Sequence, residues 1–254
     1  MILEPTELNV LTERELARYD RQIMMDRFGV EGQERLKKAK VFVAGAGGLG
    51  SPVSIYLSVA GVGKLRIVDR DTVELSNLNR QILHWEKDIG STKASSAGDK
   101  LRQMNSNVEV ETMVETITED NISQLAEGYD LIVDAMDNFP TRYLLNKTAI
   151  EKRIPLFHGG IYGMSGIATT IIPGETPCLR CIFPEAPPPE KFPVVGVAPA
   201  IIGCIQATEV IKYIVGIGNL LTNRLLIFDG LNSEFREVKP SRATNCRDCA
   251  PIWC

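Results

Sequence analysis

The sequence predicts an α/β protein whose mostly parallel sheet has helices on both faces and continues into an antiparallel portion near the C-terminus. From residue 40 to residue 158, short runs rich in valine and isoleucine alternate with helical stretches. This alternation is typical of a parallel sheet covered on both faces. A glycine-rich turn joins the first run to its helix, and after residue 160 the runs no longer alternate regularly with helices.

Composition indicates one soluble unit. A chain of 254 residues with 44% hydrophobic content can bury one substantial core. The 28 Lys and Arg against 32 Asp and Glu, a net charge of -4, give no broad basic surface, so we expect neither direct nucleic-acid binding nor membrane association. The chain contains no uninterrupted apolar run of ~18 residues and its start does not resemble a secretory signal. We therefore expect a cytoplasmic protein.

The sequence predicts one domain, 1–254, that consists of three consecutive portions. An arm (1–38) contains an amphipathic helix at 12–28, whose stripe is formed by Leu16, Tyr19, Ile23 and Met24. In the nucleotide-binding core (39–173), the expected strands are 40–45, 65–71, 108–113, 130–135, 155–158 and 166–174, and the expected helices are 48–61, 92–105, 119–127 and 141–152. The last portion (174–254) has a Pro-rich crossover loop at 184–193, a helix at 200–216 and strands at 224–228 and 234–238, where a small β-rich partner could dock.

The glycine-rich turn predicts a nucleotide site. Gly45, Gly47 and Gly50 have G-x-G-x-x-G spacing between a predicted strand and helix, which brings helix N-terminal N–H groups against a phosphate. Asp69 ends the next strand, about 20 residues on, where a carboxylate can accept hydrogen bonds from ribose. The combination favours a Rossmann-like nucleotide fold over a purely structural tight turn. It does not distinguish ATP from NAD.

Further polar residues follow the predicted strands, on the side where parallel sheets bind ligands. They are Ser76-Asn-Leu-Asn-Arg-Gln81, Lys93, Asp134, Asp137 and Asn138. Taken one at a time, each residue has an equally good explanation without a nucleotide. Arg80 could form a surface ion pair, Lys93 could be a solvated charge on a helix, and Asn138 could be a helix N-cap. Two cations and an acid that converge on one crevice make these separate readings improbable.

From Arg18 onwards the sequence resembles the ThiF/MoeB/HesA family of ubiquitin-activating-enzyme-like proteins. The resemblance is carried in order by GxGGxG, DxDxVxxSNLNRQ, a lysine, DxxDN and two CxxC pairs. It implies ATP-dependent adenylylation of the terminal carboxylate of a small ubiquitin-like sulfur-carrier protein ending in Gly-Gly. The products are an acyl-adenylate and pyrophosphate.

The resemblance also implies roles for particular residues. Asp137 positions Mg²⁺, and Arg21 reaches the phosphates of the partner subunit in a homodimer. The catalytic set is Asp137, Arg80, Lys93 and Arg21. The nucleotide-binding set is Gly45, Gly47, Gly48, Gly50, Asp69, Asp71, Ser76, Asn77, Asn79, Arg80, Lys93, Asp137 and Asn138. Such residues fit the chemistry, because a carboxylate attacking ATP needs cations to align two anions and to meet charge on phosphoryl oxygens.

Four cysteines predict a structural Zn²⁺ site. Cys178 and Cys181 form one CxxC pair, and Cys246 and Cys249 form another. Four thiolates in tetrahedral array suit zinc, and we favour this over two independent redox pairs. The metal would fasten the C-terminal tail to the start of the crossover loop.

The remaining cysteines and histidines indicate no nucleophile. Cys204 lies in an apolar helix and is interpreted as a core residue, while the role of the terminal Cys254 stays open. His84 and His158 are interpreted as structural, with His158 the nearer to the site. The crossover segment 182–203 contains no cysteine, so we expect the enzyme to stop at the acyl-adenylate and an external sulfur donor to attack it.

Three rival functions are weighed. A small-molecule or tRNA-base carboxylate could replace the carrier, although the CxxC pairs favour a protein substrate. An NAD-dependent oxidoreductase lacks a substrate domain after Gly160, and a non-catalytic carrier-binding scaffold would not need Arg80, Lys93 and Asp137. The sequence does not identify the carrier, its pathway or the sulfur donor.

Overall fold

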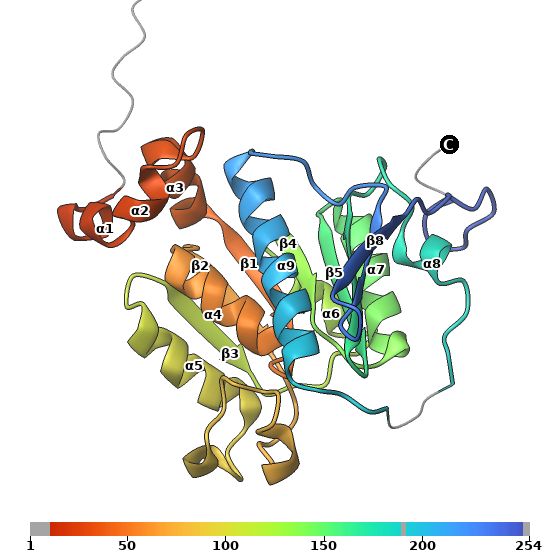
Figure 1. Cartoon of the computed structure of the whole chain (residues 1–254), viewed down its shortest axis with the longest axis horizontal. Helices are drawn as coiled ribbons and strands as arrows, with labels where there is room; N and C mark the ends of the chain where they lie inside the picture. Colours follow the sequence, from red (N-terminus) through yellow and green to blue (C-terminus); the bar gives the residue numbers. More distant parts are fainter. Residues whose placement is uncertain (1–10, 189–191, 251–254) are drawn as a thin grey trace, which may run out of the picture.

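One eight-stranded sheet organises the chain (Figure 1). The computed structural model describes residues 11–188 and 192–250, and the strand order is β3-β2-β1-β4-β5-β6-β7-β8. The first five strands in this order run parallel and the last three are antiparallel additions. The strands are β1 (Lys40–Ala44), β2 (Lys64–Val68), β3 (Glu109–Met113), β4 (Leu131–Asp134), β5 (Leu156–Tyr162), β6 (Ser165–Ile171), β7 (Leu225–Asp229) and β8 (Glu234–Val238). The predicted fold class is confirmed.

Helices cover both faces of the parallel part, and β1 shows how. Val41 and Val43 belong to one apolar cluster and the alternating Phe42 and Ala44 to another, because successive side chains of a strand point to opposite faces. The first cluster includes residues of α3 (Gly29–Lys38), α4 (Gly50–Ala60), α5 (Lys93–Met104) and α9 (Val197–Val215), and the second includes residues of α6 (Ile122–Leu125), α7 (Phe139–Lys152) and α8 (Leu179–Ile182).

Helix α9 is long and apolar enough to cross a membrane by length and composition alone. It packs instead against α4, β5 and β6. Its buried Gln206 donates from Nε2 to the carbonyl oxygens of Asp134 (2.8 Å) and Phe157 (2.9 Å). A Cβ on Gly159 would lie 2.5 Å from the Gln206 amide, so this glycine permits the close approach of α9 to β5. The apolar composition of α9 therefore reflects burial within the fold.

The arm differs from the prediction of a single helix at 12–28. It contains α1 (Glu13–Arg18) and α2 (Asp20–Ile23), separated by Tyr19 and followed by a turn. Tyr19 is buried, and its hydroxyl accepts a 2.8 Å hydrogen bond from Nδ2 of Asn105. The predicted apolar stripe is incomplete, because Met24 is 67% exposed. The contact that buries Tyr19 therefore interrupts the single helix that the apolar periodicity predicted.

Other differences are small but affect the site. The prediction omitted α3 and the single turn α8, and α6 is shorter than expected. Helix α7 begins at Phe139 because Asn138 caps it, and β2 ends at Val68, so that Asp69 lies just beyond the strand. The sheet runs continuously from β6 to β7 across the predicted division at 173/174. That division stays a prediction.

We predict that Tyr19→Phe lowers the free energy of unfolding by about 1–3 kcal/mol, the usual cost of leaving a buried polar group unpaired. Removing the hydroxyl leaves one N–H of the fully buried Asn105 without its acceptor. Urea denaturation measures the change. Arg21→Ala, two residues along the same arm but exposed, serves as the control and should leave stability nearly unchanged; equal losses in both variants would contradict the docking argument.

Candidate nucleotide and metal sites

The expected nucleotide residues, other than Arg21, gather where β1, β2 and β4 end. The chain passes from β1 to β2 and β3 on one side and returns to β4 on the other, so the adjacent ends of β1 and β4 form a topological switch point, the usual ligand position in such sheets. Gly45 to Gly50 follow β1, Asp69 and Asp71 follow β2, and Asp137 and Asn138 follow β4. Lys93 begins α5.

The glycine loop is close-packed at its ends. Gly45 has a φ of 99°, and a Cβ there would lie 2.7 Å from the carbonyl oxygen of Ala135. A Cβ on Gly50 would lie 2.0 Å from the carbonyl oxygen of Gly45. Larger residues are therefore excluded at both positions. The middle glycines are less confined: a Cβ on Gly47 would first meet Gln81 at 3.7 Å.

The half-buried Asp69 and the buried His84 hold the peptide groups of Ala46 within this loop. Asp69 accepts a 2.8 Å hydrogen bond from the Ala46 N–H through Oδ2, and Oδ1 accepts from the N–H of Asp71 at 2.8 Å. The Ala46 carbonyl lies 2.8 Å from Nε2 of His84, and Nδ1 of His84 lies 2.9 Å from Oγ of Ser96. Because a carbonyl only accepts, Nε2 carries the proton and donates, while Nδ1 accepts from the serine.

Burial governs the protonation of both groups. It lowers the pKa of His84, with nearby Lys100 and Lys93 adding repulsion, so the imidazole is neutral as the two hydrogen bonds require. Burial raises the pKa of Asp69, and the two N–H donors and Lys93 oppose that rise. The structural interpretation of His84 agrees with this geometry: the ring fixes the glycine loop against α5.

Lys93 is paired and buried, not a solvated helix charge. Its side chain is 8% exposed and its Nζ lies 2.9 Å from Oδ2 of Asp71, while Thr92 caps the helix start. This pair borders a cavity of about 370 Å³ lined by Arg70, Asp71, Thr72, Glu74, Asn77 and Lys93. Arg70, which the motif reasoning did not select, adds a second cation there.

Arg80 is held by neutral oxygens. Its Nη1 donates to the Ser76 carbonyl (2.8 Å) and to Oδ1 of Asn79 (2.9 Å), and we find no carboxylate partner for it within the parts of the chain that the structure describes. Its Cγ lies 3.6 Å from where a Cβ on Gly48 would stand. The segment is also covered by α9, since a Cβ on Gly196 would lie 2.2 Å from the Asn79 carbonyl oxygen.

The turn that carries Asp137 lies beside the glycine loop. The Met136 sulfur is 3.4 Å from the position of a Cβ on Gly45. Asp137 is exposed, and its Oδ1 accepts a long 3.4 Å hydrogen bond from Nδ2 of Asn138. Asn138 caps α7 through a 2.9 Å bond from the Thr141 N–H to its Oδ1, so the capping role considered for it is present.

Arg21 lies elsewhere. It is exposed on α2, and the arm leads through α3 into the start of β1, whereas the nucleotide residues follow the ends of the strands. Figure 1 shows α1 to α3 at one end of the parallel strands and the loops after β2 at the other. Within one chain the structure does not bring Arg21 to the other candidate residues.

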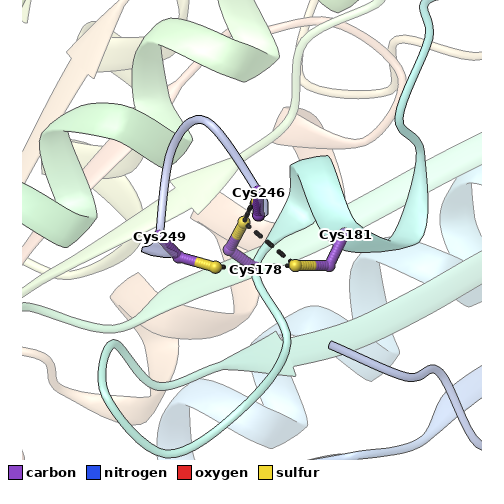
Figure 2. A group of neighbouring side chains, drawn as sticks. All are labelled: Cys178, Cys181, Cys246 and Cys249. Atoms are coloured by element: carbon purple, nitrogen blue, oxygen red, sulfur yellow. Dashed lines mark hydrogen bonds between the residues drawn. The ribbon is translucent and has the colours of Figure 1, made fainter. Parts of the chain in front are cut away.

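The four cysteines of the two CxxC pairs do converge (Figure 2). Cys178 is the N-cap of α8 and Cys181 lies within its single turn, while Cys246 and Cys249 come from the C-terminal segment. All four sulfur atoms lie within 4.8 Å of one another, with separations of 3.5 Å (Cys181 to Cys249) and 3.6 Å (Cys178 to Cys246). Four sulfurs bound at ~2.3 Å in a tetrahedron would stand roughly 3.8 Å apart, so the cluster has the dimensions of a closed tetrathiolate metal site.

Surrounding contacts fasten both halves of the cluster to α7. Asp248 accepts hydrogen bonds through Oδ2 from Nδ2 of Asn146 (2.9 Å) and Nε of Arg180 (3.3 Å), and Oδ1 of Asn146 accepts from the Leu179 N–H at 2.8 Å. Burial raises the pKa of Cys249 to about 12 and also raises the pKa of Cys178. Burial acts in the same direction on Cys246, but the N–H donors of Cys249 and Asp248 and the neighbouring thiols outweigh it, so the pKa of Cys246 is lowered.

Two buried polar residues near the site were missed in the sequence analysis. Gln206 is 1% exposed and Arg142 is 8% exposed. A polar residue on the buried face of an apolar helix was the available signal for Gln206. For Arg142 the sequence offered none, because its partners are the main-chain carbonyl groups of Met136 and Gly159.

The crossover loop returns alongside the β5–β6 turn. The N–H of Gly163 donates to the Pro193 carbonyl (2.8 Å), the N–H of Val195 donates to the Gly163 carbonyl (3.0 Å), and the rings of Tyr162 and Phe192 stack with centroids 6.2 Å apart. Cys204 is half-buried on α9, and burial raises the pKa of its thiol. Cys254 lies outside the described residues.

Comparison with known proteins gives one family. A sequence model of the ThiF family matches residues 19–248. The SAMP-activating enzyme E1 of Haloferax volcanii is 46% identical over 245 residues, covering 94% of this chain and 90% of that protein. The sulfur carrier protein adenylyltransferase of Thermus thermophilus is 44% identical over 249 residues, covering 94% and 92%. The adenylyltransferase and sulfurtransferase MOCS3 of Culex quinquefasciatus is 45% identical, but this chain spans only 56% of its length.

Solved structures share the fold. The crystal structure of PaaA superposes with a TM-score of 0.80 at 26% identity, covering 92% of this chain and 85% of that one. Escherichia coli MccB with ATP gives 0.80 at 22% identity, covering 94% and 82%. At this identity the likeness to MccB concerns the fold alone.

We predict that the cysteine cluster binds about one Zn²⁺ per chain and that its affinity weakens as the pH falls. Each cysteine must lose its proton to become a ligand, and burial raises the pKa of two of them, so uptake releases protons and is favoured by higher pH. Chelator competition in mildly acidic and mildly alkaline buffers measures this. Cys249→Ser should lose the metal, whereas the control Cys204→Ser should retain it; metal-free native protein of full stability would contradict the assignment.

Proposed function

The chain belongs to the ThiF family, and from this membership we propose that it uses ATP to adenylylate the C-terminal glycine carboxylate of a small ubiquitin-like sulfur-carrier protein. Two relatives of similar length, named as a SAMP-activating enzyme and a sulfur carrier protein adenylyltransferase, support the reaction. The observation that supports the proposal is structural: the glycine loop, Lys93, Arg80 and the exposed Asp137 all lie around the adjacent ends of β1, β2 and β4, at the switch point of the sheet.

Each group has a role in binding the nucleotide. The N–H groups from Gly47 to the start of α4 would face the phosphates, as at other helix N-termini, because the N–H groups of Gly45 and Ala46 already donate to Val68 and Asp69. Asp69 uses lone pairs on both oxygens for Ala46 and Asp71, and each oxygen retains a second lone pair for a ribose hydroxyl. Lys93 and Arg80 offset the charge of the phosphates and orient the α-phosphorus for in-line attack.

Asp137 has the chemistry to hold Mg²⁺. It is exposed, and the described residues give it one long hydrogen bond only, which leaves carboxylate lone pairs for a hard cation. Such an ion would neutralise charge on the phosphates when bound. Zn²⁺, by contrast, belongs with the sulfur ligands of the cysteine cluster.

No protein nucleophile is needed to form the acyl-adenylate, because the carrier's own carboxylate attacks ATP. The crossover segment 182–203 contains no cysteine, and the half-buried Cys204 has a raised pKa, which disfavours a thiolate. We therefore propose that the enzyme releases or presents the adenylate to a separate sulfur donor, either sulfide or a sulfur-carrying protein.

Exposed surface supports the proposed partners. Met24 (67% exposed) and Met25 (55%) stand beside Arg21 on the arm, and burying them in a homodimer would let Arg21 reach the partner's site. The edge strand β8 is exposed along its length, including Phe235 and Val238, and offers a small β-rich carrier a place to dock. Reduced thiols at the cysteine cluster fit a cytoplasmic location.

We predict that Asp137→Ala folds normally and loses carrier-dependent ATP–pyrophosphate exchange by at least ~100-fold, the scale expected when a group that stabilises phosphoryl charge is removed. The assay uses the host's small proteins that end in Gly-Gly. Asp120→Ala, an exposed acid before α6, is the matched control and should keep exchange. Near-normal exchange by the Asp137 variant would refute the assignment.

We predict that no carrier adduct released by thiols accumulates on the enzyme during turnover, because the reaction ends at the adenylate. Denaturing electrophoresis with and without reductant, after incubation with ATP and carrier, tests this. Cys254→Ser should keep full exchange activity. A covalent adduct that survives denaturation, is released by thiol and vanishes in Cys254→Ser would overturn the proposal.

A further inference from the structure

A fully buried acid and histidine lie behind the turn that carries Asp137. Asp134 ends β4, His158 is its neighbour in register on β5, and both are 0% exposed. Nδ1 of His158 lies 2.7 Å from Oδ2 of Asp134. Because a carboxylate accepts, Nδ1 carries the proton and donates it. Burial lowers the pKa of His158, so the imidazole is neutral.

The other oxygen of Asp134 holds the turn itself. Oδ1 accepts a 3.1 Å hydrogen bond from the N–H of Met136. Arg142, on α7, holds the same residue from the opposite side, donating to the Met136 carbonyl from Nε (3.2 Å) and Nη2 (2.7 Å). Nη2 also donates to the Gly159 carbonyl at 3.3 Å. Met136 is thus held at both its N–H and its carbonyl, and Asp137 is the next residue.

These contacts form one connected set. The Arg142 guanidinium lies 3.9 Å from Oδ2 of Asp134, the oxygen that accepts from His158. The main-chain carbonyl of Asp134 is held by Gln206. The ring of Phe183, just after α8, lies 5.9 Å from the His158 ring. The acid is therefore enclosed on several sides, and its two carboxylate oxygens serve different partners.

We propose that Asp134, His158 and Arg142 are positioning residues that fix the Met136 peptide groups and thereby aim the Asp137 carboxylate. This inference rests on the proposed role of Asp137 and extends it. The alternative is that the set only stabilises the packing of α7 on β4 and β5. Positioning matters to catalysis because a carboxylate displaced by about 1 Å can cost roughly 100-fold in rate.

Two substitutions of the same residue separate these roles. His158→Asn places an amide N–H near the position of Nδ1–H and can still donate to Asp134, whereas His158→Leu fills the space without a donor. We expect His158→Leu to lower kcat for ATP–pyrophosphate exchange by roughly 10- to 100-fold with little change in the KM for ATP. Hydrogen exchange of the 134–139 segment should accelerate. His158→Asn should restore both towards the wild-type values.

A second variant covers the case in which His158→Leu fails to fold. Arg142→Lys keeps the positive charge but replaces the planar fork with a single ammonium group, so it should give the same fall in kcat and the same local acceleration. If both His158 variants lose equal activity, or if kcat falls while exchange of 134–139 stays unchanged, the positioning role is wrong. The Asp137→Ala result is independent of this outcome, so failure of the proposed function and failure of this inference are distinguishable.

Discussion

Parallel pairing of β1 with both β2 and β4 is the constraint on which the fold and the candidate site depend. In register, Ala44 lies opposite Val68 of β2 on one side and Asp134 of β4 on the other. The three strands therefore end together, and the residues that follow each end are forced into one region. The glycine loop, Asp69 and Asp137 are far apart in sequence, yet they meet because of this register. A one-residue slip would turn their side chains to the wrong faces.

Helix α9 is the second organising element, and it connects the site to the antiparallel strands. Its N-cap, Gly196, packs against the segment that carries Arg80, and Pro199 in its first turn lies next to Gly48 of the glycine loop. Its middle reaches the carbonyl of Asp134 through Gln206. Farther along, Glu209 accepts from Thr170 of β6 and from the N–H of Leu221. The helix that follows the crossover loop therefore also supports the glycine loop, the turn that carries Asp137 and the antiparallel strands.

Local spacing decided what the sequence could predict. The glycine loop, the cap at Asn138 and each CxxC pair are encoded by neighbouring residues, and the alternation of apolar runs predicted the parallel sheet. Partners distant in sequence decided the rest. The break at Tyr19 depends on Asn105, the burial of Lys93 depends on Asp71, and the hold on the Asp134 carbonyl depends on Gln206. Periodicity and motif spacing carry no information about such contacts, so the arm was predicted as one helix.

The two cations proposed to meet the phosphates are held in different ways, and this difference affects how a nucleotide would bind. Lys93 is buried against the carboxylate of Asp71, so a phosphate must share it with an existing charged partner. Within residues 11–188 and 192–250, Arg80 donates to a carbonyl and an amide oxygen and to no carboxylate. Hydrogen bonds between charged groups are stronger than those to neutral acceptors, so exchanging these oxygens for phosphate oxygens is favourable. In the proposed site, Lys93 would therefore be a fixed part of the binding surface, whereas Arg80 would be the cation that turns onto the phosphates when ATP binds.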